Sequence, residues 1–119
     1  MNLGAVRVGQ IGHRAIFFPP AKEQLRSLAP ETKRRIREGI RILMVDPRLG
    51  KPLRNQLAGC WRFRAQRYRI IYRIKQEQQL VEILFIGHRR EIYRIAADAI
   101  RLMESRGVYR AKPTRAPLP

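Results

Sequence analysis

Acidic residues are scarce in this sequence of 119 residues, which has 9 aspartate and glutamate side chains against 26 lysine and arginine side chains. The formal net charge is +17 at pH 7, and repulsion among so many like charges disfavours a compact chain. The excess therefore predicts a polyanionic partner, either a nucleic acid or an acidic protein segment. A membrane surface fits less well, because no basic amphipathic helix dominates the sequence.

Cysteine and long apolar runs are also nearly absent. Cys60 is the only cysteine, which excludes an intramolecular disulfide and a cysteine-based metal cluster. The most apolar stretch, Leu80 to Ile86, is interrupted by Glu82 and is far too short to span a bilayer. The start of the sequence lacks the apolar core and cleavage site of a secretory signal. These absences predict a reducing, cytoplasmic location.

The length and the 45% content of apolar residues fit one domain with a single modest core. Residues 1–13 and 107–119 show no periodicity, so we expect a flexible N-terminus and a disordered basic tail around a domain over residues 14–106. The expected elements of that domain are a strand over 14–18, helices over 20–28 and 30–45, strands over 61–64, 68–75 and 80–86, and a helix over 91–105.

The order β-α-α-β-β-β-α predicts an α+β fold with two layers. The short breaks between the last three strands favour antiparallel neighbours. We expect a mainly antiparallel four-stranded sheet, with an N-terminal helical hairpin and a C-terminal helix packed on its apolar side. The segment 46–59, which contains proline and glycine among polar residues, is expected to be a loop.

The segment GCWRFRAQRYRIIYRI, at positions 59–74, alternates arginine with large apolar residues. Successive side chains of a strand point to opposite faces, so one face is predicted to be apolar and to meet the helices. The other face is predicted to be cationic and to carry Arg62, Arg64, Arg69 and Arg73. Arginines on one face of a sheet are often only a solvated surface, but the charge excess favours a binding site.

A second polar group lies where the last strand ends, in GHRREIY, which contains His88, Arg89 and Tyr93. Guanidinium groups bind phosphate bidentately, tyrosine stacks on unpaired bases, and histidine exchanges protons near neutral pH. The two groups together predict a site at which RNA is cleaved by attack of a 2′-hydroxyl on its own phosphorus, with arginines stabilising the charge of the transition state. The alternative role for His88 is structural, as a loop residue whose imidazole donates a hydrogen bond to a backbone carbonyl.

The stretches FFPPAKEQLRSL, GKPLRNQLAGCWRFRAQRYRIIYRI and EILFIGHRREIYR resemble the RelE/ParE toxins of bacterial type II toxin–antitoxin systems. The resemblance spans roughly residues 14–105 and is closer to the RelE side. It implies an endoribonuclease that needs no metal or cofactor, cleaves mRNA in the ribosomal A site and leaves 2′,3′-cyclic ends. It also implies an acidic antitoxin as partner, and an amphipathic segment of that antitoxin would suit the cationic sheet face and the helical hairpin.

The resemblance also assigns roles to residues. Arg62 and Arg64 stand where well-studied RelE toxins carry paired lysines, Arg69 and Arg89 match phosphate-binding arginines, and Tyr93 matches a base-stacking tyrosine. Arginine does not lose its proton in proteins, so neither Arg62 nor Arg64 is expected to accept the 2′-hydroxyl proton. His88 is then the expected acceptor, with Tyr93 a weaker candidate because phenols release protons only well above neutral pH. No metal site is predicted, because neither histidine has a second ligand at a suitable spacing.

Two other functions remain open from the sequence. ParE toxins poison DNA gyrase, so the chain is alternatively a gyrase inhibitor that acts through protein contacts. The arginines at the paired lysine positions also suit a catalytically weak toxin that binds RNA and its antitoxin but does little chemistry.

Overall fold

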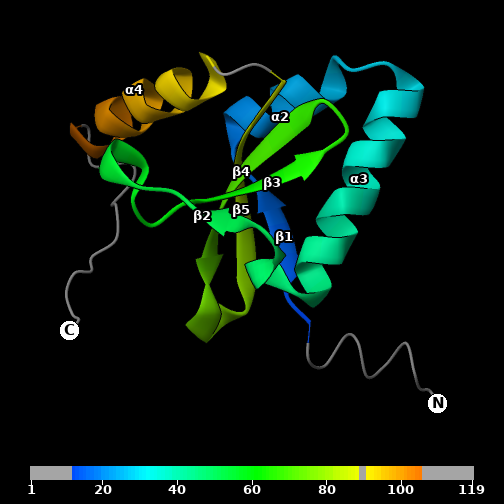
Figure 1. Cartoon of the computed structure of the whole chain (residues 1–119), viewed down its shortest axis with the longest axis horizontal. Coiled ribbons are helices and arrows are strands. Elements are labelled where there is room, and N and C mark those ends of the chain that lie inside the picture. The colour runs from blue at the N-terminus through cyan, green and yellow to red at the C-terminus, as the bar shows by residue number, and fades with distance from the viewer. Residues whose placement is uncertain (1–11, 89–90, 106–119) are drawn as a thin grey trace.

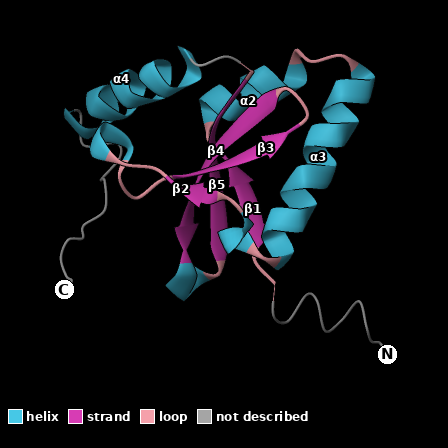
Figure 2. Ribbon diagram, viewed as in Figure 1, coloured by secondary structure: helices cyan, strands magenta, loops and turns pink. Residues whose placement is uncertain are grey.

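The computed structural model describes residues 12–88 and 91–105, which form a five-stranded sheet with helices on both of its faces (Figures 1 and 2). The strands are β1 (Arg14–Phe17), β2 (Lys51–Pro52), β3 (Trp61–Ala65), β4 (Tyr68–Lys75) and β5 (Leu80–Gly87). The α-helices are α2 (Pro19–Arg26), α3 (Pro30–Val45) and α4 (Glu91–Ser105). None of the described helices is long and apolar enough to cross a membrane.

The strand order across the sheet is β1-β5-β4-β3-β2. Strands β3, β4 and β5 are antiparallel neighbours, as predicted, while β1 pairs in parallel with β5 at one edge. The expectation of four strands was wrong by one, because β2 lies within the segment predicted as a loop. It is only two residues long, and Lys51 and Pro52 pair with Arg62 and Trp61. A proline is compatible with β2 because β2 is the other edge of the sheet.

The helical hairpin covers one face of the sheet. Both helices begin at prolines, whose missing amide hydrogens cost nothing in the first turn. The apolar stripe of α3 then packs on the side chains of alternating strand residues, and the resulting core contains Ile36, Ile40, Leu43, Ile70, Tyr72, Val81 and Ile83. We call this side of the sheet the hairpin face.

The C-terminal helix α4 lies on the opposite face from the hairpin, which corrects the expectation that all helices share one side. Ile92, Ala96 and Ile100 of α4 pack against Ile71 and other buried residues in a second core cluster. Ile71 is the neighbour of Ile70 and Tyr72 on β4, so its side chain points away from the hairpin face. Figure 1 accordingly shows α3 and α4 on opposite sides of the sheet.

His13, the last residue of the segment predicted to be a flexible N-terminus, is part of the folded domain. His13 is buried, and its amide donates to the carbonyl oxygen of Met44 at 2.7 Å. This bond joins the start of β1 to the end of α3. Residues 1–11 and 106–119 lie outside the described residues.

A buried tyrosine fixes the turn that leads into β2. The side chain of Tyr72 is fully buried, and its hydroxyl donates to the Pro47 carbonyl oxygen at 2.5 Å. The same hydroxyl accepts from the Gly50 amide at 3.2 Å. A Cβ atom at Gly50 would lie 2.4 Å from both the Arg62 carbonyl oxygen and the Tyr72 hydroxyl, so only glycine permits this close approach. The backbone of β2 is therefore held against β3.

We expect the stability of the chain to fall in alkaline solution through Tyr72. Burial raises the pKa of Tyr72 to about 12, whereas an unfolded tyrosine titrates near pH ~10. Between these values the folded chain keeps a proton that the unfolded chain has lost, so the free energy of unfolding decreases as the pH rises, by roughly 2–3 kcal/mol. Urea unfolding followed by circular dichroism from pH ~9 to pH ~12 measures this loss.

The Tyr72→Phe variant provides the comparison, because it cannot ionise and keeps nearly the same shape. The difference in unfolding free energy between the two proteins should shrink steadily across the window. A difference that stays constant would assign the alkaline loss to other groups.

Candidate active site

The predicted arginines are brought together on the face opposite the hairpin. Arg64 and Arg69 are direct partners across β3 and β4, and Arg62 shares the face with Arg64 because it lies two residues away on the same strand. Side chains of directly opposed residues in an antiparallel pair have Cβ atoms about 4.5–5.5 Å apart. We call Arg62, Arg64 and Arg69 the arginine cluster.

Arg69 lies beside the tyrosine predicted to stack on a base. Its guanidinium carbon is 5.9 Å from the centroid of the Tyr93 ring, within the range of a cation–π contact. The Arg69 Nε is buried and makes no hydrogen bond to the described residues. A buried donor without a partner is unfavourable, and an oxygen atom of a bound anion could pair with this nitrogen only if the side chains that cover it move.

A glycine allows Tyr93 to reach Arg69. Gly87 is the direct partner of Arg69 across β4 and β5. A Cβ atom at Gly87 would lie 2.7 Å from the Cδ1 of Ile92, which is closer than two carbon atoms can approach. The first turn of α4 therefore packs directly on the end of β5, and this places the next residue of α4, Tyr93, at the edge of the arginine cluster.

Arg73 shares the face of the arginine cluster but is paired with an acid. Its Nη2 lies 2.8 Å from the Glu82 Oε1, and its Nε donates to the same oxygen at 2.9 Å. The side chains of Arg73 and Glu82 are only 11% and 10% exposed. A neutralised, nearly buried arginine attracts a phosphate less than an open one, so the geometry favours the arginine cluster over Arg73 as the anion site.

The His88 ring is turned away from the face of the arginine cluster. Its ring stacks on Tyr68, with the ring centroids 5.0 Å apart and the planes at 25°. Tyr68 packs with the core of the hairpin face, so the imidazole is oriented to that side. The position of His88 gives no geometric support to its predicted role as proton acceptor, which continues to rest on imidazole chemistry alone. Arg89, the other predicted residue of this stretch, lies outside the described residues.

Sequence reasoning missed a fourth cation that lies next to the arginine cluster. Lys51 is the direct partner of Arg62 across β2 and β3, so both side chains project from the same face. A cavity of about 380 Å³ beside this pair is lined by Leu49, Gly50, Lys51, Arg62, Phe63 and Arg64. No local pattern could have revealed Lys51, because a strand of two residues has no periodicity.

Tyr93 also borders a second hollow. A cavity of about 480 Å³ lies between residues 53–57 and α4, and its lining includes Leu53, Leu57, Tyr93 and Ala97. These apolar groups form a surface on which a planar base can rest, and Arg54 and Arg94 line the same cavity. Tyr93 therefore lines this cavity and also contacts Arg69 of the arginine cluster.

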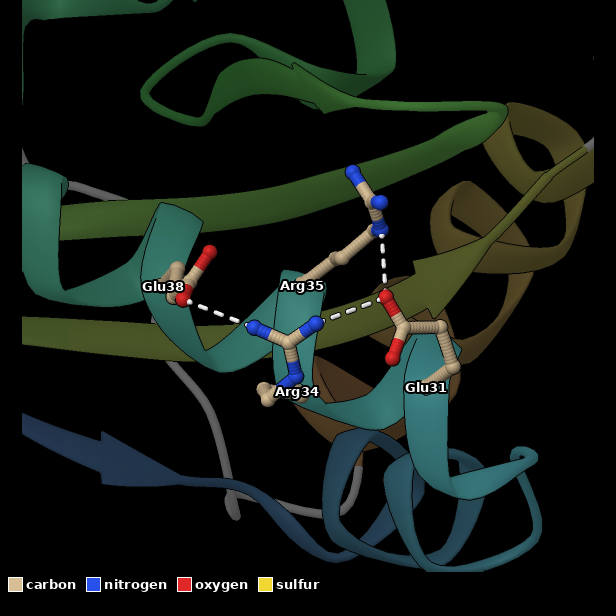
Figure 3. Close-up of polar contacts among 4 residues, drawn as sticks. All are labelled: Glu31, Arg34, Arg35 and Glu38. Carbon is tan, nitrogen blue, oxygen red and sulfur yellow. Dashed lines mark hydrogen bonds and ion pairs between the residues drawn. The ribbon is translucent and has the colours of Figure 1, made fainter.

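The basic residues of α3 differ from the arginine cluster because two of them are paired along the helix (Figure 3). Arg34 contacts Glu31 at 2.7 Å and Glu38 at 3.3 Å, and Arg35 contacts Glu31 at 3.0 Å. Hydrogen bonds from Arg34 and then Arg35 lower the pKa of Glu31. These pairs are exposed and contribute little to stability, but they reduce the positive charge of this helix surface.

The described residues do not contain a cluster of three or more histidine, cysteine, aspartate or glutamate side chains that could hold a metal ion. The site built by the described residues is cationic, with an aromatic ring at its edge. Such a site is suited to bind a phosphodiester and an adjoining base.

Comparison with known proteins places this geometry in a family. The model for the ParE toxin of type II toxin–antitoxin systems, parDE, matches residues 15–93. Toxin RelG of Mycobacterium tuberculosis is 51% identical over 47 residues, which are 40% of this chain and 54% of RelG. Toxin RelE of the same organism is 46% identical over 48 residues, which are 40% of this chain and 50% of that toxin. The chain thus spans about half the length of the curated relatives it matches.

The matches to solved structures cover nearly the whole length of the solved chains. A chain of the toxin–antitoxin complex RelBE2 from M. tuberculosis is 36% identical with a TM-score of 0.63, and the match covers 66% of this chain and 100% of that one. A mutant of the Escherichia coli toxin RelE in the free state has a TM-score of 0.62 at 21% identity, over 75% of this chain and 98% of that one, and shows the shared fold. Because the family model matches well over half of its residues, this chain belongs to the RelE/ParE family of type II toxins.

Proposed function

We propose that this chain is a toxin that cleaves mRNA on the ribosome as an endoribonuclease that requires no metal. The observation that carries the proposal is the convergence of Arg62, Arg64 and Arg69 from paired strands, next to Tyr93. Three guanidinium groups on one side of a sheet can hold a phosphodiester, and the aromatic ring can hold an unpaired base beside it. The RelE and RelG toxins named above have related sequences, which favours this activity over binding alone.

In the proposed reaction the substrate supplies its own nucleophile. The 2′-oxygen of a ribose forms a bond to the adjacent phosphorus, the bond from phosphorus to the 5′-oxygen breaks, and a 2′,3′-cyclic phosphate results. The 2′-hydroxyl must lose a proton and the 5′-oxygen must gain one. The arginine cluster would stabilise the extra negative charge on the phosphoryl oxygens in the transition state, where preorganised donors have their largest effect. Arg89 is proposed as a further phosphate ligand on the strength of the sequence resemblance.

An acidic antitoxin is the proposed protein partner. The related M. tuberculosis chain was solved in the toxin–antitoxin complex RelBE2. In this chain the net charge of +17 and the open arginine cluster suit an acidic segment that competes with RNA for the same surface.

The decisive experiment is to induce the chain in bacterial cells and to map new RNA ends. We expect growth to stop and cuts with 2′,3′-cyclic ends to accumulate inside translated reading frames. An inhibitor of translation initiation, which leaves mRNA without elongating ribosomes, should abolish the cuts, because the proposed substrate is mRNA on the ribosome. If growth stops but mRNA stays intact, the endoribonuclease proposal is wrong.

A second candidate function is inhibition of DNA gyrase. The match of residues 15–93 to the ParE toxin model favours it. A supercoiling assay with purified gyrase separates the two candidates. An endoribonuclease should leave supercoiling unchanged even when the toxin is added at the concentration that it reaches in growth-arrested cells. Loss of supercoiling with intact mRNA would select the gyrase inhibitor.

A further inference from the structure

The arginine cluster leaves one step of the proposed reaction without a residue. The 5′-oxygen that departs from phosphorus must receive a proton, because a sugar alkoxide is a poor leaving group. A guanidinium group can stabilise charge but does not release its proton in proteins. His88 stacks on Tyr68 on the hairpin side. A proton donor is therefore needed on the face of the arginine cluster, where the described residues offer Tyr93 at one edge and a lysine at the other.

Lys51 is placed to meet this need. It is the direct partner of Arg62, and Arg64 lies on the same face two residues along β3. The three cations line one side of the 380 Å³ cavity, and Leu49, Gly50 and Phe63 line the rest. Diagonal neighbours across an antiparallel pair are about 7–8 Å apart, a distance that a long lysine side chain covers. A phosphate held by Arg62 and Arg64 would then lie within reach of the Lys51 ammonium group.

The backbone of Lys51 is fixed although its side chain is exposed. The preceding residue, Gly50, donates to the buried Tyr72 hydroxyl and approaches the Arg62 carbonyl more closely than a Cβ atom would allow. On the other side, the Leu53 amide donates to the Cys60 carbonyl oxygen at 2.9 Å. The lysine therefore starts from a defined point beside Arg62, while its side chain keeps the freedom to follow a substrate.

We infer that Lys51 is the general acid of the proposed endoribonuclease, an inference that rests on the function proposed above. As the bond between phosphorus and the 5′-oxygen breaks, the Lys51 ammonium gives one proton to the 5′-oxygen and becomes a neutral amine. The product with a free 5′-hydroxyl leaves, and the amine recovers its proton from water. The arginine cluster holds the phosphate throughout the step.

The inference is tested with Lys51→Arg, which keeps the positive charge but cannot deliver the proton, and with Lys51→Ala. Lys75→Arg is the matched control, since Lys75 lies at the far end of β4. Cleavage of a ribosome-bound mRNA is measured for an ordinary substrate and for one in which sulfur replaces the bridging 5′-oxygen at the cut. A thiolate leaves without a proton, so this substrate does not need a general acid.

On the ordinary mRNA, we expect Lys51→Arg and Lys51→Ala to cut about 100-fold more slowly than the wild type, and Lys75→Arg to match the wild type. On the sulfur substrate, all four proteins should cut at rates within a few-fold of one another. Equal losses on both substrates, or a wild-type rate for Lys51→Arg on the ordinary mRNA, would reject Lys51 as the acid while leaving the proposed function intact. A wild-type protein that cuts neither mRNA would reject the proposed function itself and, with it, this assignment.

Discussion

Arg69→Ala is expected to reduce the cleavage of translated mRNA about 1,000-fold, the upper range for the loss of one preorganised donor to a transition-state oxygen. Arg69 occupies the centre of the site, opposite Arg64 on β3 and Gly87 on β5 and beside the Tyr93 ring. Its buried Nε makes no hydrogen bond to the described residues. The alanine variant would thus remove both a phosphate donor and the group that orients the stacking tyrosine. Single-turnover cleavage of ribosome-bound mRNA measures the rate of the step itself.

Arg67→Ala is the matched control for this variant. Arg67 is exposed in the turn between β3 and β4, two residues from Arg69, and its removal changes the net charge by the same amount. It should cut at nearly the wild-type rate. If the two variants lose activity equally, the site depends on overall charge and not on the geometry of the arginine cluster. Thermal unfolding of both proteins separates a loss of chemistry from a loss of folded protein.

Glu82→Ala is expected to lower the free energy of unfolding by about 3–5 kcal/mol, the usual cost of removing one partner from a buried ion pair. Glu82 is paired with Arg73 at 2.8 Å, and both side chains are about nine-tenths covered. In the variant the Arg73 guanidinium would lose this carboxylate while it remains within the sheet. Urea unfolding followed by circular dichroism gives the change directly.

Glu77→Ala serves as the comparison, because Glu77 is exposed in the short turn between β4 and β5. Its effect should stay within about 0.5 kcal/mol. Replacing both partners, with Arg73→Met and Glu82→Leu, should recover most of the stability, since two apolar side chains of similar size can fill the space of the ion pair. A loss for Glu82→Ala no greater than that for Glu77→Ala would mean that water enters and screens the pair.

The elements with strong periodic patterns could be predicted from the sequence. The bounds of α3, β4 and α4 match the predicted ranges 30–45, 68–75 and 91–105. Alternation with apolar residues along β3 and at the start of β4 also predicted that Arg62, Arg64 and Arg69 lie on one face, because the apolar residues between them favour the opposite face.

The side of the sheet chosen by α4 could not be predicted. An amphipathic helix shows which of its own residues are buried, but both faces of this sheet present apolar groups. Ile70 and Tyr72 of β4 pack in the core of the hairpin face, whereas Ile71 between them packs in the core under α4. An unbroken apolar run of this kind does not show which face of the sheet a helix covers. Strand β2 and Lys51 were missed for a different reason, since their positions depend on the contacts of Gly50 with Tyr72 and Arg62, residues remote in the sequence.

The parallel pairing of β1 with β5 has a consequence for the synthesis of this chain. Arg14 and Phe17 pair with Leu80 and Ile83, so the first strand leaves the ribosome long before its partner exists. Contacts between such distant segments form late and slowly. The helical hairpin cannot complete its packing before β5 is synthesised, because its apolar stripe packs on residues of β4 and β5. A nascent chain interrupted before β5 would lack the partner of both β1 and β4, so we expect premature termination before residue 80 to release fragments without this fold.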